Sequence, residues 1–523
     1  MEILSKNAFY RFLFNPDRKY FYLVCGLFLI SFLVTKLSYF FYYPVWRTTI
    51  DIYSYCDPVV AIKNHTWPVF DLRTPAYPLF LAATYFAGIG LNGTLFIQML
   101  SSLAACLVSV YMVYNYKRYV FFPFSICLLL FYSSGEFTSI NTLIHPVSLF
   151  TDAILLFSVF LIVGIDTQKT KFLISASLLY ALVIFLRPQG LFIVGIAAAA
   201  GVISFIGNRN LKCLLPLGAP MAFFFVALFT YNYFTFHVFG FSNFSTLGKL
   251  GYVIYFVEES PDYPAAMNQT IREVKLAIGD GEKKICDKQM PLAALDTVFT
   301  NDKYDNCWRF LPFIQNNNEL VAKLLSRASA SSGPNAWKEF SICFMRFNSM
   351  EYHPFSFYFN ELRNRVNYIE SGKDVYTNVL KKEQYHVVWR EWEGEMVNHK
   401  VADYPVLKTE TDFTRLVKQE PKTVRLLNYF EVFYNVIFSQ KVWIFLYYIS
   451  LLISVLLLLF NLLSRSTLDP VLLLPSIPLL NSILVSLIIP PLTFYVFPTK
   501  FFFIVSPFLI LFYLIRLYGK RTA

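Results

Sequence analysis

The chain alternates between long apolar segments and polar connections, and apolar segments dominate both of its ends. An α-helix needs about 20 apolar residues to cross the hydrocarbon core of a bilayer. On that criterion the sequence predicts about ten membrane-spanning helices. We expect them over residues 20–39, 93–114, 120–132, 149–165, 172–186, 191–206, 214–236, 442–463, 468–489 and 501–515.

Three regions follow from this pattern. Residues 1–236 are predicted to form an N-terminal transmembrane module, and residues 442–523 the last transmembrane helices. Between them, residues 237–441 hold most of the charged side chains and are long enough to fold as a separate soluble domain, either mixed α/β or mostly helical. The sequence therefore predicts a polytopic α-helical membrane protein with a soluble insert.

Lysines and arginines between the predicted spans indicate how the chain is oriented. The positive-inside rule assigns the face on which they gather to the cytoplasm. The first loop, about residues 40–92, then lies on the extracytoplasmic face together with loop 133–148 and the insert. An apolar helix at 78–90 must lie in the interface or re-enter, because a crossing there would reverse every later loop. The basic residues are Arg18, Lys19, Lys117, Arg118, Lys169, Lys171, Arg209, Lys212, Arg465, Lys520 and Arg521.

Composition supports the membrane assignment. Of the 523 residues, 56% are hydrophobic and only 15% are charged, whereas soluble domains hold about 25% charged residues. The formal net charge is +11, which inner loops and contact with anionic membrane lipids account for. No basic patch stands outside the loops and tails, so nucleic acid is not an expected partner. None of the eight cysteines forms a CxxC pair, which argues against a thiolate zinc site.

Candidate chemistry concentrates in the first loop. Asp51 is followed by Tyr55, and Arg73 and Tyr77 belong to the run RTPAYP that opens an apolar helix. An acid and an arginine beside the mouth of a membrane helix suit a reaction on a charged lipid head group, and tyrosine rings can stack on a sugar. The alternative for Asp51 alone is an ordinary interfacial acid or a helix N-cap.

The spacing of these residues resembles a known family. Asp51, three residues, Tyr55 and then RTPAYPLFLA are similar to the first outer loop of the GT-C glycosyltransferases, in the branch of the protein O-mannosyltransferases and aminoarabinose transferases. Asp152, which follows Thr151, resembles the acidic residue that the family carries after its second outer loop. The LRPQG run around Arg187 resembles the family's Thr-Arg-Pro turn between two spans. The late FPTKF run departs from the family pattern, because Lys500 replaces an arginine. The 237–441 insert matches nothing in the family.

The resemblance implies a GT-C fold and a glycosyltransferase whose donor is a sugar on a polyprenyl phosphate such as undecaprenyl phosphate. The acceptor would be a hydroxyl of a glycan, a lipid or a protein, and transfer would invert the anomeric carbon. In this interpretation Asp51 is the general base and Asp152 a second catalytic residue. The implied substrate-binding residues are Tyr55, Arg73, Tyr77, Arg187 and Lys500, whose cations would hold the lipid phosphate.

Several alternatives stay open at this point. No cofactor is required, but a divalent cation held by Asp51 and Asp152 is compatible with the residues. Asp152 could instead cap its helix, Arg187 could be a turn residue that snorkels, and Lys500 could simply end a span. His145 reads as a plain loop residue. The alternative functions are a polymerase or ligase of lipid-linked oligosaccharides and a transporter.

The expected location is the bacterial inner membrane, as part of the cell envelope, with the active site on its periplasmic face. The short loops favour this location, and the membrane of the endoplasmic reticulum is the alternative. The sugar and the acceptor are not indicated by any residue of the sequence.

Overall fold

The structure is a computed structural model, and it describes the two ends of the chain and part of the insert. Asp51 lies outside the described residues, as does most of 237–441. The described residues are 12–37, 40, 47–48, 53–68, 70, 73–141, 143–208, 214–236, 250, 253–278, 306–316, 318–332, 441–463, 469–488 and 497–521.

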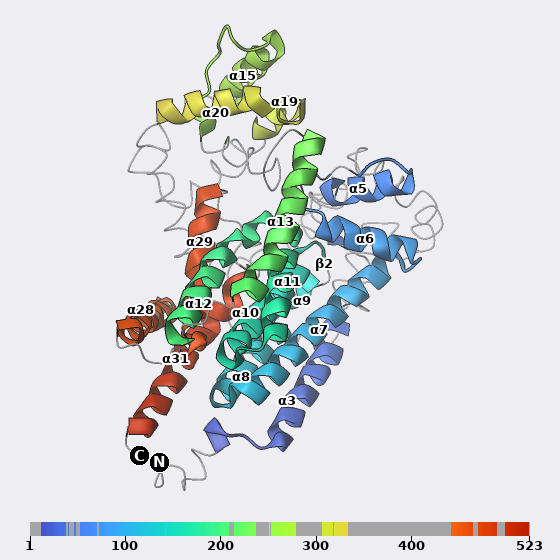
Figure 1. The fold of residues 1–523 in the computed structure, drawn as a ribbon. Coiled ribbons are helices and arrows are strands. Elements are labelled where there is room, and N and C mark those ends of the chain that lie inside the picture. Colours follow the sequence, from blue (N-terminus) through green and yellow to red (C-terminus); the bar gives the residue numbers. More distant parts are fainter. Residues whose placement is uncertain are drawn as a thin grey trace.

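The apolar segments form helices where the sequence predicts them (Figure 1). Six helices are long and apolar enough to cross a membrane, counted over the described residues. The protein is therefore an α-helical membrane protein. The other predicted spans coincide with shorter apolar helices, and that these also cross stays a prediction. The helices are α3 Arg18–Ser31 with its π-helical continuation η1 Phe32–Leu37, α7 Gly90–Tyr116, α8 Phe121–Ser133, α10 Val147–Thr167, α11 Thr170–Leu186, α12 Ile193–Asn208, α13 Leu214–Phe236, α28 Lys441–Leu463, α29 Ser476–Ile488 and α31 Lys500–Arg521.

Helix α10 forms the centre of the bundle. In its apolar window 83% of the residues are buried, against 22% in α28 and 17% in α13. A helix that is apolar on all sides and buried on all sides belongs to a core, whereas exposed apolar sides suit contact with lipid. Helices α7 and α11 pack on α10. Gly164 permits a close approach to α11, because a Cβ there would lie 2.8 Å from the Leu173 side chain.

The first and second loops meet at one end of this bundle. Helix α5 (Tyr53–Lys63) packs on α6 (Ala76–Phe86), and both lie near the start of α7, away from the chain termini (Figure 1). Strand β1 (Arg47–Thr48) pairs in parallel with β2 (Leu143–Ile144), which follows the short helix α9 (Gly135–Asn141). The helix expected at 78–90 is therefore present as α6, while its depth in the membrane stays a prediction.

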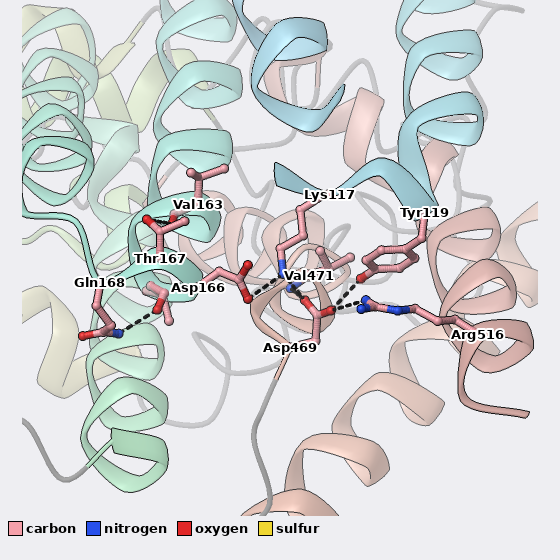
Figure 2. Close-up of polar contacts among 10 residues, drawn as sticks. Lys117, Tyr119, Val163, Asp166, Thr167, Gln168, Asp469, Val471 and Arg516 are labelled. Atoms are coloured by element: carbon pink, nitrogen blue, oxygen red, sulfur yellow. Dashed lines mark hydrogen bonds and ion pairs between the residues drawn. The ribbon is translucent and has the colours of Figure 1, made fainter. Parts of the chain in front are cut away.

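The opposite end of the bundle is closed by charged side chains, which we call the Asp469 cluster. Lys117 Nζ lies 2.9 Å from a carboxylate oxygen of Asp166 and 2.9 Å from one of Asp469. Asp469 also accepts hydrogen bonds from Tyr119 Oη at 2.7 Å and from Arg516 Nη1 at 3.4 Å (Figure 2). This cluster joins the ends of α7, α10 and α31 to the segment before α29.

The described part of the insert is helical and packs around its own core. It contains η6 Ile254–Phe256, α15 Ala265–Ile278, η8 Trp308–Phe310, α19 Leu311–Asn316 and α20 Asn318–Ser332. Ile254, Met267, Ile271 and Phe310 are fully buried within this small core. The boundaries 237 and 441 stay predictions, because most of the insert lies outside the described residues.

Candidate functional site

The predicted site residues that the structure describes are all buried. Tyr55 lies on α5, Tyr77 on α6 and Asp152 on α10. Arg187 follows α11, and Lys500 begins α31. Burying a charged side chain in an apolar bundle is costly unless other groups compensate, so such residues usually have a functional or structural partner. The exposed fractions are 1% for Tyr55, 8% for Arg73, 0% for Tyr77, 4% for Asp152, 6% for Arg187 and 2% for Lys500.

The three first-loop residues form one compact group. The rings of Tyr55 and Tyr77 meet edge to face, with centroids 5.3 Å apart and planes at 85°. The guanidinium carbon of Arg73 lies 4.8 Å from the centroid of the Tyr55 ring. A cation over an aromatic face at this distance contributes about 0.5–2 kcal/mol, depending on desolvation. The packing of α5 on α6 thus orients Arg73, because its guanidinium group stacks on the Tyr55 ring.

His145 joins this group from the second loop. Its ring is 2% exposed and stands edge-on to Tyr55, with centroids 5.9 Å apart. The backbone N–H of Val147 donates to His145 Nδ1 at 3.4 Å, which leaves Nε2 to carry the proton of the neutral ring. Burial and the nearby positive charges of Arg187 and Arg73 hold the pKa of His145 well below its ordinary value.

Arg73 and Arg187 are far apart in the sequence, and both contact aromatic rings next to the His145 segment. Arg73 stacks on Tyr55, whose ring meets His145, and the guanidinium carbon of Arg187 lies 5.9 Å from the ring centroid of Phe150 on α10, the helix that begins two residues after His145. We call Tyr55, Arg73, Tyr77, His145 and Arg187 the His145 cluster. Sequence reasoning missed the histidine, because a His-Pro pair before a span looks like any loop. The available signal was its position in loop 133–148, directly before the helix that carries Asp152.

Neutral hydrogen bonds connect the His145 cluster to Asp152. Tyr77 Oη donates to Gln98 Oε1 at 3.4 Å, and Gln98 Nε2 donates to the carbonyl oxygen of Asn141 at 3.0 Å. Ser102 Oγ links Asn141 to Asp152, because it lies 3.0 Å from Asn141 Oδ1 and 2.7 Å from Asp152 Oδ2. Asp152 does not cap α10, because Pro146 occupies the N-cap position and Asp152 lies beyond the first turn. The catalytic role expected for Asp152 stays a prediction.

A second chain of hydrogen bonds links the segments that carry Arg187 and Lys500. Gln189 Nε2 donates to Asn481 Oδ1 at 2.7 Å, and Asn481 Nδ2 donates to Thr499 Oγ1 at 3.1 Å. Gln189 is two residues after Arg187, and Thr499 directly precedes Lys500. Through α29, the C-terminal helices are thereby tied to the turn between α11 and α12.

A metal site is not evident in the described residues. No group of three His, Cys, Asp or Glu side chains lies together there in a way that could hold a metal ion. Because Asp51 lies outside those residues, a cation shared by Asp51 and Asp152 stays a prediction. Asp152 borders a small cavity that is otherwise mostly apolar, lined by Cys106, Leu128, Phe131, Phe137, Thr151, Leu155, Pro498, Phe501 and Phe502.

The chain was also compared with known proteins. No family model, curated protein or solved structure matched it. The function is therefore argued from the side chains that the structure brings together.

Proposed function

We propose that the protein is a membrane glycosyltransferase of the GT-C type. It transfers a sugar from a polyprenyl-phosphate donor to an acceptor hydroxyl on the extracytoplasmic face of the membrane. The observation that most supports this proposal is the burial of two arginines against aromatic rings around the His145 segment, Arg73 on Tyr55 and Arg187 on Phe150. A lipid phosphate that departs from the sugar needs cationic and N–H donors held ready for its developing charge.

The proposed reaction is a single displacement. Asp51 removes the proton of the acceptor hydroxyl as that oxygen attacks the anomeric carbon. The new carbon–oxygen bond forms while the bond to the phosphate oxygen breaks, and the electron pair leaves with the lipid phosphate. Arg73, Arg187 and Lys500 are assigned to hold this anion. Attack opposite the leaving group inverts the anomeric carbon.

The positions of the residues support these roles. Asp51 precedes Tyr55 by four residues, and Tyr55 stacks on Arg73. The neutral His145 ring can donate through Nε2 and adds no further charge beside the two arginines. Tyr55 and Tyr77 are proposed to orient the sugar and the phosphate indirectly, because both rings are almost fully buried in this state.

The test is an assay of purified protein with a panel of polyprenyl-phosphate sugars. We expect one donor to release free lipid phosphate in the presence of acceptor. The proposal would be contradicted if lipid phosphate were released without an acceptor, or if no donor in the panel released it. Release of a lipid diphosphate would favour the polymerase or ligase class. For variants of the buried arginines in this assay, the matched control is Arg272→Ala. Arg272 is an exposed arginine of the insert, and its side chain is 64% accessible.

A further inference from the structure

The connection between α5 and α6 carries Arg73, and a helix that the proposed mechanism does not use contacts its middle part. Tyr231 of α13 donates a hydrogen bond from Oη to the carbonyl oxygen of Pro68 at 2.5 Å. The Tyr231 ring also lies at 25° to the ring of Trp67, with centroids 6.1 Å apart, and meets Phe70 with centroids 5.7 Å apart. One side chain of α13 thus contacts three residues of the connection.

The end of α5 directs the chain toward this contact. His65 adopts a left-handed backbone conformation with a φ of 56°. The backbone N–H of Thr66 donates to the carbonyl oxygen of Ala61 at 2.9 Å, and the Thr66 hydroxyl donates to the same oxygen at 3.0 Å. A left-handed residue with such bonds commonly ends a helix and turns the chain. Trp67 and Pro68 therefore leave α5 in a fixed direction.

Helix α13 is a firm support for the contact, because it packs along α11. The backbone N–H of Met221 donates to Ser177 Oγ at 3.1 Å, and the rings of Tyr180 and Phe225 meet edge to face with centroids 6.0 Å apart. Tyr231 follows Phe225 by about 1.7 helical turns. The end of α13 that carries it lies at the same end of the bundle as α5 and α6 (Figure 1). The connection is therefore attached to a helix that α11 holds in place.

The contact reaches Arg73 through a short stretch of chain. Arg73 follows Phe70 by three residues, so their α-carbons are at most about 11 Å apart. Both side chains are 8% exposed. From the other side, the Arg73 guanidinium stacks on the Tyr55 ring of α5. The place of the guanidinium over that ring therefore depends on where Phe70 is held, and Tyr231 contacts Phe70 directly.

We propose that Tyr231 is a positioning residue that clamps the connection between α5 and α6 to α13 and thereby fixes Arg73 over Tyr55. The clamp also joins the first loop to the helix from which the chain enters the insert. The clamp itself does not depend on the proposed function, whereas its effect on the lipid donor rests on that function.

Chemical modification of arginine tests the clamp without any sugar donor. The full chain in lipid nanodiscs is treated with phenylglyoxal, and mass spectrometry measures the modification rates of Arg73 and of Arg187, which is similarly buried at 6% exposure. In Tyr231→Ala we expect the Arg73 rate to rise at least about fivefold, because the hydrogen bond and the ring contacts are lost. The Arg187 rate should not change. An unchanged Arg73 rate, or an equal rise at both arginines, would overturn the proposal.

Two further variants separate the clamp from a general loss of structure. Tyr233→Ala is the matched control, because Tyr233 is a 51% exposed tyrosine of the same helix whose ring meets that of its neighbour Phe234. Both modification rates should stay at their original values in this variant, and a rise at Arg73 equal to that in Tyr231→Ala would contradict the clamp.

Tyr231→Phe keeps the ring and removes only the hydrogen bond to Pro68. We expect the Arg73 modification rate to rise about twofold in this variant, as the loss of one hydrogen bond implies. If Tyr231→Ala does not accumulate, Tyr231→Phe decides the question, and an Arg73 rate equal to that of the original protein then counts against the clamp.

Donor kinetics test the consequence for the proposed function. We expect Tyr231→Ala to raise the KM for the lipid donor at least about threefold and to leave the KM for the acceptor unchanged. In an Arg73→Ala background the same change should not raise the donor KM further, because Tyr231 acts through Arg73. An equal rise in both backgrounds would overturn the positioning role. If no donor is turned over, the proposed function fails, while arginine modification still decides the clamp.

Discussion

The Asp469 cluster and the His145 cluster lie at opposite ends of the same helices, and they handle charge in different ways. On α10, Asp152 and Asp166 are separated by about 21 Å at 1.5 Å per residue. At the Asp166 end, Lys117 touches two carboxylates, and Asp469 binds Lys117, Tyr119 and Arg516 (Figure 2). At the other end, Arg73 stacks on Tyr55 beside His145 and Arg187 lies over Phe150, and hydrogen bonds between uncharged groups connect the helices around them.

The contrast suggests different tasks for the two ends. An end in which each cation contacts a carboxylate serves to hold helices together. The proposed function assigns the arginines of the His145 cluster to an anionic ligand instead. Variants at the two ends should therefore separate stability from activity, and the following predictions test that separation.

The largest effect is expected for Asp51→Asn. Removal of a general base lowers turnover by about 100-fold to 10,000-fold. The thermal midpoint should stay unchanged, and so should binding of the lipid donor. Turnover is measured as release of lipid phosphate. Near-normal turnover in this variant would remove Asp51 from the role of base.

Asp469→Asn should act on stability instead. The change leaves Lys117, which is 5% accessible, and Arg516 with a weaker partner. Breaking a buried ion pair costs about 3 kcal/mol of unfolding free energy, whereas turnover per folded molecule should not change. The control is Asp166→Asn, for which we expect a smaller loss of unfolding free energy. Asp166 is 40% accessible, and Lys117 still contacts Asp469 in this variant. Equal losses in the two variants would contradict the central place of Asp469.

Arg73→Ala should weaken use of the donor more than use of the acceptor. We expect the KM for the lipid donor to rise about tenfold, as the loss of one charge-assisted contact implies. Arg73→Lys should restore only part of the function, since lysine lacks the planar group that stacks on Tyr55. A KM change confined to the acceptor would remove Arg73 from the phosphate site.

The smallest effect is expected from pH acting on His145. The folded protein keeps this ring neutral, because burial and the charges of Arg187 and Arg73 lower its pKa. The unfolded chain binds a proton below about pH 6.5, so stability is full above that pH and falls by up to about 1.4 kcal/mol per pH unit below it. In His145→Gln this part of the slope should disappear. Thermal midpoints between pH 5 and pH 8 measure it, and identical slopes would contradict it.

The sequence predicted the helices well, because the signal for each is local. The run expected at 214–236 is α13 with the same bounds, and the run expected at 149–165 is α10, extended by two residues at each end. The grouping of Tyr55, Arg73 and Tyr77 was also predictable from their short spacing. Helix α6 was likewise predictable, because a single apolar run after Pro75 forms it.

The rest of the site depends on contacts that no local pattern encodes. A tyrosine near the end of a span usually belongs to the aromatic belt at the interface, so nothing in the sequence marks Tyr231 as the partner of Pro68. His145 is buried because α5 packs against the second loop and β1 pairs with β2. Nothing local distinguishes Ser102 and Asn141 from other polar residues, and only the packing of α7 and α9 against α10 lets Ser102 bond both Asn141 and Asp152.

The hydrogen bond between Gln189 and Asn481 has a consequence for biosynthesis. Together with the bond between Lys117 and Asp469, it means that the last helices attach to residues 1–236 at both ends of the bundle. During translation, Gln189 and Lys117 are made before the insert, whereas their partners Asn481 and Asp469 are made after it. A chain that ends before residue 469 therefore lacks the acceptor of the Gln189 hydrogen bond and one of the two carboxylates that Lys117 contacts.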